Sequence, residues 1–166
     1  MRLAEELLLT RPLAPGHELA VALMLTREHL AHLHEVRVLR PAGLTDPQFN
    51  ILRILRGGPP EGCTIGDLKR RVITRAADVP RLVDRLGRLG LVRRVPNPQD
   101  RRSCRVTLTP KAEALLAATD PTHTAFGKEL EALLPPERLG PFLEDLQRLR
   151  DGLRGVVEAH GDGTES

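Results

Sequence analysis

Aromatic residues are nearly missing from this chain of 166 residues, which contains three Phe and neither Trp nor Tyr. Modules that bind single-stranded nucleic acid stack bases on aromatic rings, so we do not expect an RNA-recognition or OB-fold module. Two cysteines are too few for a disulfide framework or a thiolate zinc site. No apolar run approaches the roughly 20 residues of a membrane-spanning helix, and the amino terminus does not resemble a signal peptide. We therefore expect a cytoplasmic protein without a membrane partner.

Motifs of the common enzyme classes are missing as well. The chain has no nucleophile elbow, Walker phosphate loop or dinucleotide-binding glycine motif. It also has no pair of carboxylates in a sequence pattern that would indicate a catalytic pocket. Scattered His, Asp and Cys residues occur in any chain of this length. We therefore expect a protein that is not an enzyme and holds no cofactor.

The hydrophobic pattern predicts a mainly α-helical chain with one short β-hairpin. Thr45-Asp46-Pro47-Gln48 is a capping-box sequence that opens a helix, and Thr64 is a second candidate N-cap. Pro41 and Gly43 are expected to stop the helix before them. The expected helices span 17–40, 46–56, 64–72, a segment ending near 89, 110–133 and 137–157, and the expected strands span 91–95 and 104–109.

Three helices followed by a charged hairpin form the winged version of the helix-turn-helix. We expect an amino-terminal arm over 1–16, a helical dimerisation region over 17–42 and 110–160, a winged helix-turn-helix over 43–109, and a flexible tail over 161–166. The leucine-rich stripe from Leu139 to Val157 indicates an interface between two copies of the chain. The alternative is that the stripe packs inside a helical bundle of a single copy.

Positive charge is concentrated in one third of the chain. Residues 69–105 hold twelve Lys and Arg against three Asp, a net charge of +9. The whole chain carries only +3, so the remainder carries −6. A concentrated basic surface is typical of proteins that bind the phosphate backbone, whereas a solvated arginine-rich face is the alternative. Because the basic segment coincides with the predicted helix-turn-helix and wing, we favour binding to double-stranded DNA.

Three stretches resemble the MarR family of multiple-antibiotic-resistance-type regulators: GLTDPQFNILRIL over 43–55, TIGDLKRRV over 64–72, and PRLVDRLGRLGLVRRVPNPQDRRSCRVTLTPKAEALL over 80–116. The resemblance covers about residues 17–155. It implies a homodimer whose terminal helices interlock and whose two winged helices bind a pseudo-palindromic operator. It also implies a repressor that a small phenolic or anionic effector releases from DNA.

The same resemblance implies which residues contact DNA. Arginine can bind guanine O6 and N7 in the major groove, and helix amino termini bind phosphate. In the wing, Asp100 is expected to brace an arginine that reaches the minor groove. The expected contacts are Thr64, Thr74, Arg75, Ala76, Val79, Arg81, Arg85, Asp100, Arg101 and Arg102. Leu82, Val83 and Leu86 are expected in the core, and Leu89 is expected to face inward.

Pro80 departs from the family pattern because proline inside a helix removes a hydrogen bond. We expect Asp78 to act as N-cap, which would place Pro80 in the first turn and start the recognition helix late. The roles of residues 74–77 therefore depend on where the recognition helix begins.

Arg27, His29 and His32 interrupt the apolar stripe of the first helix and are candidates for contact with an effector. His29 and His32 lie three residues apart on one helical face, but no full metal-ligand set accompanies them, so we expect no metal site. Cys104 is expected to be a small apolar filler, whereas Cys63 is expected to be exposed.

Two other functions compete with the regulator. A winged helix can serve as a protein-interaction module, but such an interface favours exposed aromatics rather than paired arginines. An architectural DNA binder without an effector is the second alternative. Operator selection and footprinting distinguish these readings, because only a regulator yields a single inverted repeat.

Overall fold

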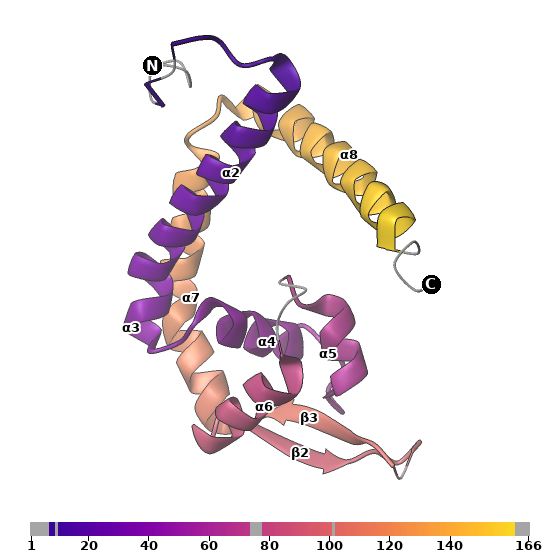
Figure 1. Cartoon of the computed structure of the whole chain (residues 1–166). Helices are drawn as coiled ribbons and strands as arrows, with labels where there is room; N and C mark the ends of the chain where they lie inside the picture. Colours follow the sequence, from indigo (N-terminus) through magenta and orange to yellow (C-terminus); the bar gives the residue numbers. More distant parts are fainter. Residues whose placement is uncertain (1–6, 9, 74–77, 101, 162–166) are drawn as a thin grey trace. The chain divides into compact units, whose positions relative to one another are not determined.

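A computed structural model describes residues 7–8, 10–73, 78–100 and 102–161 (Figure 1). The chain divides into two units, residues 1–123 and 124–166, and each is described by itself below. The first unit contains the described strands and short helices. The second holds the end of α7 (Pro110–Glu131) and all of α8 (Pro136–Gly161).

The first helical run is longer than expected. It consists of α2 (Pro15–His34), a π-helical turn η1 (Glu35–Leu39) and α3 (Arg40–Ala42). The expectation that Pro41 stops the helix is wrong. Pro41 lies in the first turn of α3, where a proline is tolerated. The stop is Gly43 alone, whose φ of 65° is in the left-handed region.

Three short helices follow: α4 (Asp46–Arg56), α5 (Ile65–Arg71) and α6 (Val79–Arg88). Each expected cap is confirmed. The backbone N–H of Thr45 donates to Gln48 Oε1 at 2.9 Å, and Asp67 N–H donates to Thr64 Oγ1 at 3.1 Å. Asp78 is the N-cap of α6, and its Oδ1 accepts from the backbone N–H of Arg81 at 3.2 Å. Pro80 therefore lies in the first turn, as expected.

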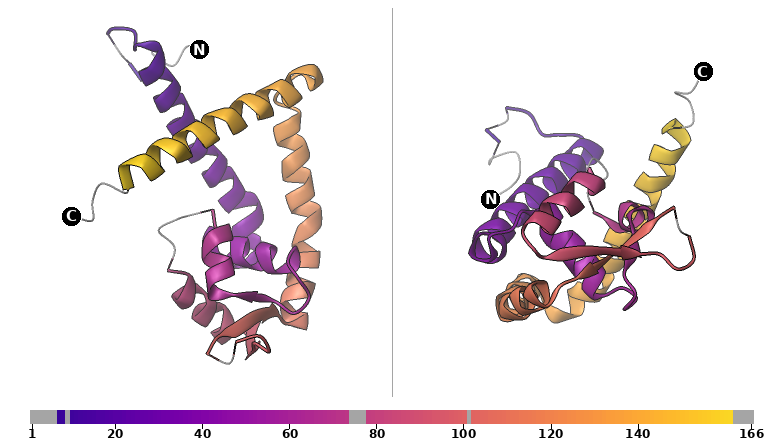
Figure 2. Two further views of the ribbon diagram at one scale, coloured as in Figure 1. Left: turned by 90° about the vertical axis from the view of Figure 1, so that its right-hand side faces the viewer. Right: turned by 90° about the horizontal axis from the view of Figure 1, so that it is seen from below.

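The sheet has three antiparallel strands in the order β1-β3-β2 rather than the expected two. These are β1 (Cys63–Thr64), β2 (Val92–Pro96) and β3 (Cys104–Leu108). Val92 pairs with Leu108 and Pro96 with Cys104, while Cys63 of β1 pairs with Val106. A strand of two residues has no alternation to detect, which is why the sequence did not predict β1. Figures 1 and 2 show the hairpin of β2 and β3 projecting beyond the short helices.

The core of the first unit lies where α4, α5, α6 and the sheet meet. Val38 and Leu39 of η1 contribute to it, as do Ala112 and Leu116 at the start of α7. The buried apolar residues of the central helices and strands are Phe49, Ile51, Leu52, Ile54, Leu55, Cys63, Leu68, Val79, Val83, Leu86, Val92 and Val106. The predicted class, mainly α with a small β-hairpin wing behind a helix-turn-helix, is therefore confirmed, and β1 adds a third strand that was not predicted.

Helix α8 contrasts with this core. None of its described side chains is buried, although its sequence carries an apolar stripe. Phe142, Leu143, Leu153, Val156 and Val157 are each about half exposed. Within the described part of the chain, no helix combines the length and apolar character needed to cross a membrane.

Candidate nucleic-acid interface

Helix α6 separates its charged and apolar side chains completely. Val79, Val83 and Leu86 are at most 1% exposed and face the core. Arg81 and Arg85 are exposed and lie four residues apart, which places them on one face of the helix. This arrangement gives α6, the second helix of the helix-turn-helix, an outward basic face that could enter a groove of DNA.

Two expectations for α6 are wrong. Val79 was expected to contact DNA, but it is fully buried, so its side chain is part of the core. It occupies the first turn of the helix, one turn before Val83 and on the same face. Leu89 was expected to face inward, but it is 45% exposed because the helix has already ended at Arg88. Val83 and Leu86 are buried as expected, and Leu82 is half-buried.

Four of the expected DNA contacts lie outside the described residues. They are Thr74, Arg75, Ala76 and Arg101. Their contacts with DNA stay predictions.

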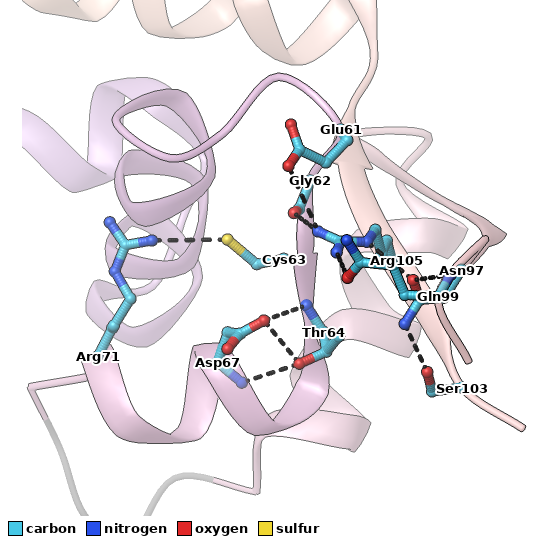
Figure 3. Close-up of polar contacts among 10 residues, drawn as sticks. All are labelled: Glu61, Gly62, Cys63, Thr64, Asp67, Arg71, Asn97, Gln99, Ser103 and Arg105. Carbon is cyan, nitrogen blue, oxygen red and sulfur yellow. Dashed lines mark hydrogen bonds and ion pairs between the residues drawn. The ribbon is translucent and has the colours of Figure 1, made fainter.

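Thr64 uses its hydroxyl inside its own helix. Its Oγ1 accepts from the Asp67 backbone at 3.1 Å and donates to Asp67 Oδ2 at 2.7 Å, while the Thr64 N–H donates to the same carboxylate oxygen at 2.9 Å (Figure 3). These hydrogen bonds, with the hydroxyl bond the largest, lower the pKa of Asp67. A phosphate contact by Thr64 stays a prediction, and its hydroxyl would have to leave Asp67 to donate to the phosphate.

The wing loop between β2 and β3 is held by hydrogen bonds from its own polar residues. Asn97 is buried, and its Nδ2 donates to Ser103 Oγ at 2.8 Å across the loop. Asp100 Oδ1 accepts from the backbone N–H of Arg102 at 2.9 Å. Asp100 thus bonds to the backbone of Arg102, whose side chain is exposed, and a brace on an arginine side chain that reaches the minor groove stays a prediction.

Arg105 is not part of the outward basic surface. Its side chain is 12% exposed and donates to oxygens of Gly62, Asn97 and Gln99 (Figure 3). The +9 of residues 69–105 therefore overstates the charge available to a partner. No sequence signal marked this residue, because an arginine in an alternating strand normally faces solvent.

The exposure of Cys63 also differs from the expectation. It was expected to be exposed, but its exposure is 2%, and its Sγ accepts a hydrogen bond from Arg71 at 3.5 Å. Cys104 is half-buried. The burial of Cys63 follows from its place in β1, which pairs with the central strand β3.

The effector candidates Arg27, His29 and His32 are all exposed on α2. No group of three His, Cys, Asp or Glu side chains within the described ranges is arranged to hold a metal ion. A contact of these residues with an effector stays a prediction.

A different ring cluster forms where the end of α2, α4 and α7 meet. The rings of His34 and Phe49 lie 5.7 Å apart, and His123 lies 5.8 Å from His34 and 5.5 Å from Phe49. Burial, followed by the charge of Arg53, lowers the pKa of His123. The sequence did not predict this cluster, because the three rings come from segments far apart in the chain.

An ion-pair group lies beside these rings. Arg56 of α4 donates to Asp120 Oδ2 at 2.8 Å, and Arg53 donates to Asp120 Oδ1 at 3.1 Å. The hydrogen bond from Arg56 is the main reason why the pKa of Asp120 is lowered and that of Arg56 is raised. The group ties the end of α4 to α7.

Comparison with known proteins identifies relatives that are transcriptional regulators. The sequence profile of the MarR family matches residues 42–103. The chain is 30% identical over 151 residues to the transcriptional activatory protein BadR of Rhodopseudomonas palustris, covering 79% of this chain and 80% of BadR.

Solved structures agree with that match. AbsC, a MarR family transcriptional regulator from Streptomyces coelicolor, is 27% identical with a TM-score of 0.76, over 88% of this chain and 99% of AbsC. The structure of Bordetella bronchiseptica BpsR, whose DNA binding is regulated by 6-hydroxynicotinic acid, has a TM-score of 0.73 at 23% identity, over 85% of this chain and 99% of BpsR. The second likeness concerns the fold alone.

Proposed function

This chain belongs to the MarR family of transcriptional regulators, and from that membership we propose that it binds double-stranded DNA as a homodimer. Each copy places α6 in the major groove and the wing in the adjacent minor groove of a pseudo-palindromic operator. The protein acts in the cytoplasm, and a small phenolic or anionic effector releases it. Membership in a family of regulators agrees with the expectation that the chain is not an enzyme.

One observation carries this proposal: α6 is buried along Val79, Val83 and Leu86 and exposes Arg81 and Arg85 on its other side. A helix of this kind presents its amino-terminal side chains to base edges while its opposite face holds it in the domain. The exposed Arg102 of the neighbouring wing supplies the minor-groove cation.

The half-exposed apolar stripe of α8 supports the dimer. Leu153, Val156 and Val157 recur at helical spacing, each about half exposed, and α2 adds Leu19 and Met24, at 50% and 70% exposure. Apolar side chains on one face of a long helix are stabilised by burial against a partner. We assign dimerisation to 17–42 and 110–160, and DNA binding to 43–109.

The proposal is tested by selecting bound fragments from genomic DNA and footprinting them. We expect one inverted repeat with half-sites about one helical turn apart. Binding that follows DNA length alone would favour an architectural protein, and absence of binding would favour a protein-docking module.

The wing is tested by the salt dependence of operator binding. Replacing Arg102 with Ala should flatten the slope of log affinity against log salt by about one unit, because one cation no longer displaces counterions. An unchanged slope and affinity would remove Arg102 from the interface. Arg11→Ala is the matched control, because it removes an exposed arginine outside both the proposed DNA interface and the proposed dimerisation region.

The direction of regulation depends on where the operator lies relative to a promoter. We propose repression, with activation as the second candidate because the relative BadR is named as an activatory protein. Transcription in vitro from a promoter that carries the selected operator separates them: added protein lowers the transcript level in the first case and raises it in the second.

The effector proposal takes its chemistry from the family resemblance, which implies a small phenolic or anionic effector. We propose that Arg27, with His29 and His32, contacts the anionic group of such an effector. Calorimetry with phenolic acids on the wild type and on Arg27→Ala tests this, and equal heats for the two proteins would overturn it.

A further inference from the structure

Arg105 of β3 forms a three-way hydrogen-bonded connection inside the first unit. Its Nε donates to Asn97 Oδ1 at 3.1 Å, its Nη1 to the Gly62 carbonyl at 2.9 Å, and its Nη2 to Gln99 Oε1 at 3.0 Å (Figure 3). The carboxylate of Glu61 lies 3.9 Å from Nη1. All three nitrogens of the guanidinium are therefore engaged within the protein, on a side chain that is 12% exposed.

The acceptors belong to two distant segments of the chain. Asn97 and Gln99 are in the wing loop, whereas Gly62 immediately precedes β1 and the Thr64 cap of α5. A single planar guanidinium thus joins the wing to the start of the helix-turn-helix. The guanidinium fixes both the distance and the direction of each acceptor, because its N–H bonds have fixed directions within one plane.

Gly62 permits this close approach. Its φ is +89°, and a Cβ at this position would lie 2.3 Å from the Val106 carbonyl oxygen. Only glycine lets the backbone pass this near to β3. The Gly62 carbonyl can therefore accept from a side chain that β3 itself carries.

Asn97 connects Arg105 to the other residues of the wing loop by hydrogen bonds. While its Oδ1 accepts from Arg105, the same oxygen accepts from the Gln99 N–H at 3.2 Å, and its Nδ2 donates to Ser103 Oγ. Ser103 in turn donates to the Asp100 carbonyl at 3.2 Å. The orientation of the Asn97 amide, set by Arg105, therefore orders both sides of the loop that presents Arg102.

We propose that Arg105 is a positioning residue for the wing: it does not contact DNA but fixes the angle at which the wing leaves the helix-turn-helix. Lysine cannot take its place, because an ammonium on a flexible stem does not supply a rigid fork to three separate acceptors. The consequence for DNA binding rests on the proposed function, but the consequence for the order of the wing does not.

The first test uses the free protein and residue-resolved amide hydrogen exchange. The backbone N–H groups of Gln99, Arg102 and Ser103 are hydrogen-bonded within the loop. Arg105→Gln and Arg105→Lys should each speed their exchange by about tenfold or more, because a charge-assisted network is lost. The matched control is Arg93→Gln, which removes an exposed arginine on β2 that bonds only to Thr107 among the contacts described and should leave these rates unchanged.

Gln99→Ala provides a milder variant in case the Arg105 variants fold poorly. It removes one acceptor at the exposed end of the fork and leaves the bonds of Arg105 to Gly62 and Asn97 in place. The three amides should then exchange about threefold faster. Unchanged exchange in Gln99→Ala and in Arg105→Lys would overturn the proposal.

The second test is a double-mutant cycle on operator binding. Arg105→Gln should weaken binding about tenfold in the wild type but less than about twofold in Arg102→Ala, because Arg105 acts through the wing. An equal loss in both backgrounds would mean that Arg105 contacts DNA directly or supports the whole fold, and would overturn the proposal. If the wild type binds no operator, the proposed function fails, and the exchange measurement still decides whether Arg105 positions the wing.

Discussion

The winged helix-turn-helix over 43–109 and the helix α8 contain similar apolar side chains and use them in opposite ways. In the first, Ile51, Leu52, Leu68 and Leu86 are completely buried. In the second, Leu153 and Val156 are more than half exposed, and none of the helix's described side chains is buried. The comparison teaches that the winged helix-turn-helix encloses its own core, whereas α8 leaves an apolar face exposed, which the proposed dimer would cover.

The largest effect should come from placing a charge on that apolar face. Leu153→Glu should convert the protein to a monomer in analytical ultracentrifugation and weaken operator binding about hundredfold, because an unpaired carboxylate in an apolar interface is costly and a monomer reaches one half-site. Gln147→Glu adds the same charge to an exposed position of the same helix. A Leu153→Glu protein that is still dimeric would contradict the assignment of α8.

The next effect tests the dense packing of the DNA-binding region. Gly62→Ala should lower the free energy of unfolding by about 2 to 4 kcal/mol, because its methyl group meets the backbone of Val106 at a left-handed φ. Gly66→Ala is the control, since its methyl group would find its nearest neighbours at 3.7 and 3.8 Å. Denaturant unfolding measures both, and equal stabilities would show that β1 moves away from β3 freely.

A smaller effect is expected at the outward face of α6. Arg81→Ala should weaken operator binding about tenfold, the loss expected for an arginine that reads one base pair. It should leave the unfolding transition unchanged, because the side chain is exposed. Binding titrations against operators substituted at single positions would also reveal the base that Arg81 reads. A variant that binds all sequences as tightly as the wild type would exclude this arginine.

The smallest effect concerns the ring cluster of His34, Phe49 and His123. His123 faces Arg53, His34, Asp120 and Arg56, and its pKa in the folded state is lowered from 6.5 mainly by burial. Below pH 6.5, His123 therefore binds a proton more readily in the unfolded chain than in the folded protein. Its contribution to the free energy of unfolding is present above that pH and is lost as the pH falls. His123→Phe keeps a ring at this position and should flatten the dependence of unfolding free energy on pH. An identical slope in wild type and variant would contradict it.

Much of the DNA-binding region could be predicted from sequence because its signals are local. The caps at Thr45, Thr64 and Asp78 follow from residue types a few positions apart, and the late start of α6 follows from Pro80. Burial of Val83 and Leu86 follows from helical spacing.

What escaped prediction depends on contacts across the chain. Arg105 looks like any exposed strand arginine until Gly62, forty-three residues earlier, meets it. The ring cluster of His34, Phe49 and His123 and the burial of Cys63 also need the tertiary fold. Val79 was misassigned to DNA because the family resemblance placed it among the contacts, although its spacing of four residues from Val83 puts it on the buried face of α6.

The π turn at Glu35–Leu39 has a consequence for how such a chain can diverge. It is closed by the Arg40 N–H on the Glu35 carbonyl, one residue further back than in an α-helix. Each residue turns a helix by about 100°, and Val38 and Leu39 are anchored in the core. Loss of a single codon in this turn would rotate the whole of α2 by about that angle while every core residue stays in place. If the proposed dimer forms through α2, a lineage could therefore change how its two copies meet in one genetic step and keep α6 intact.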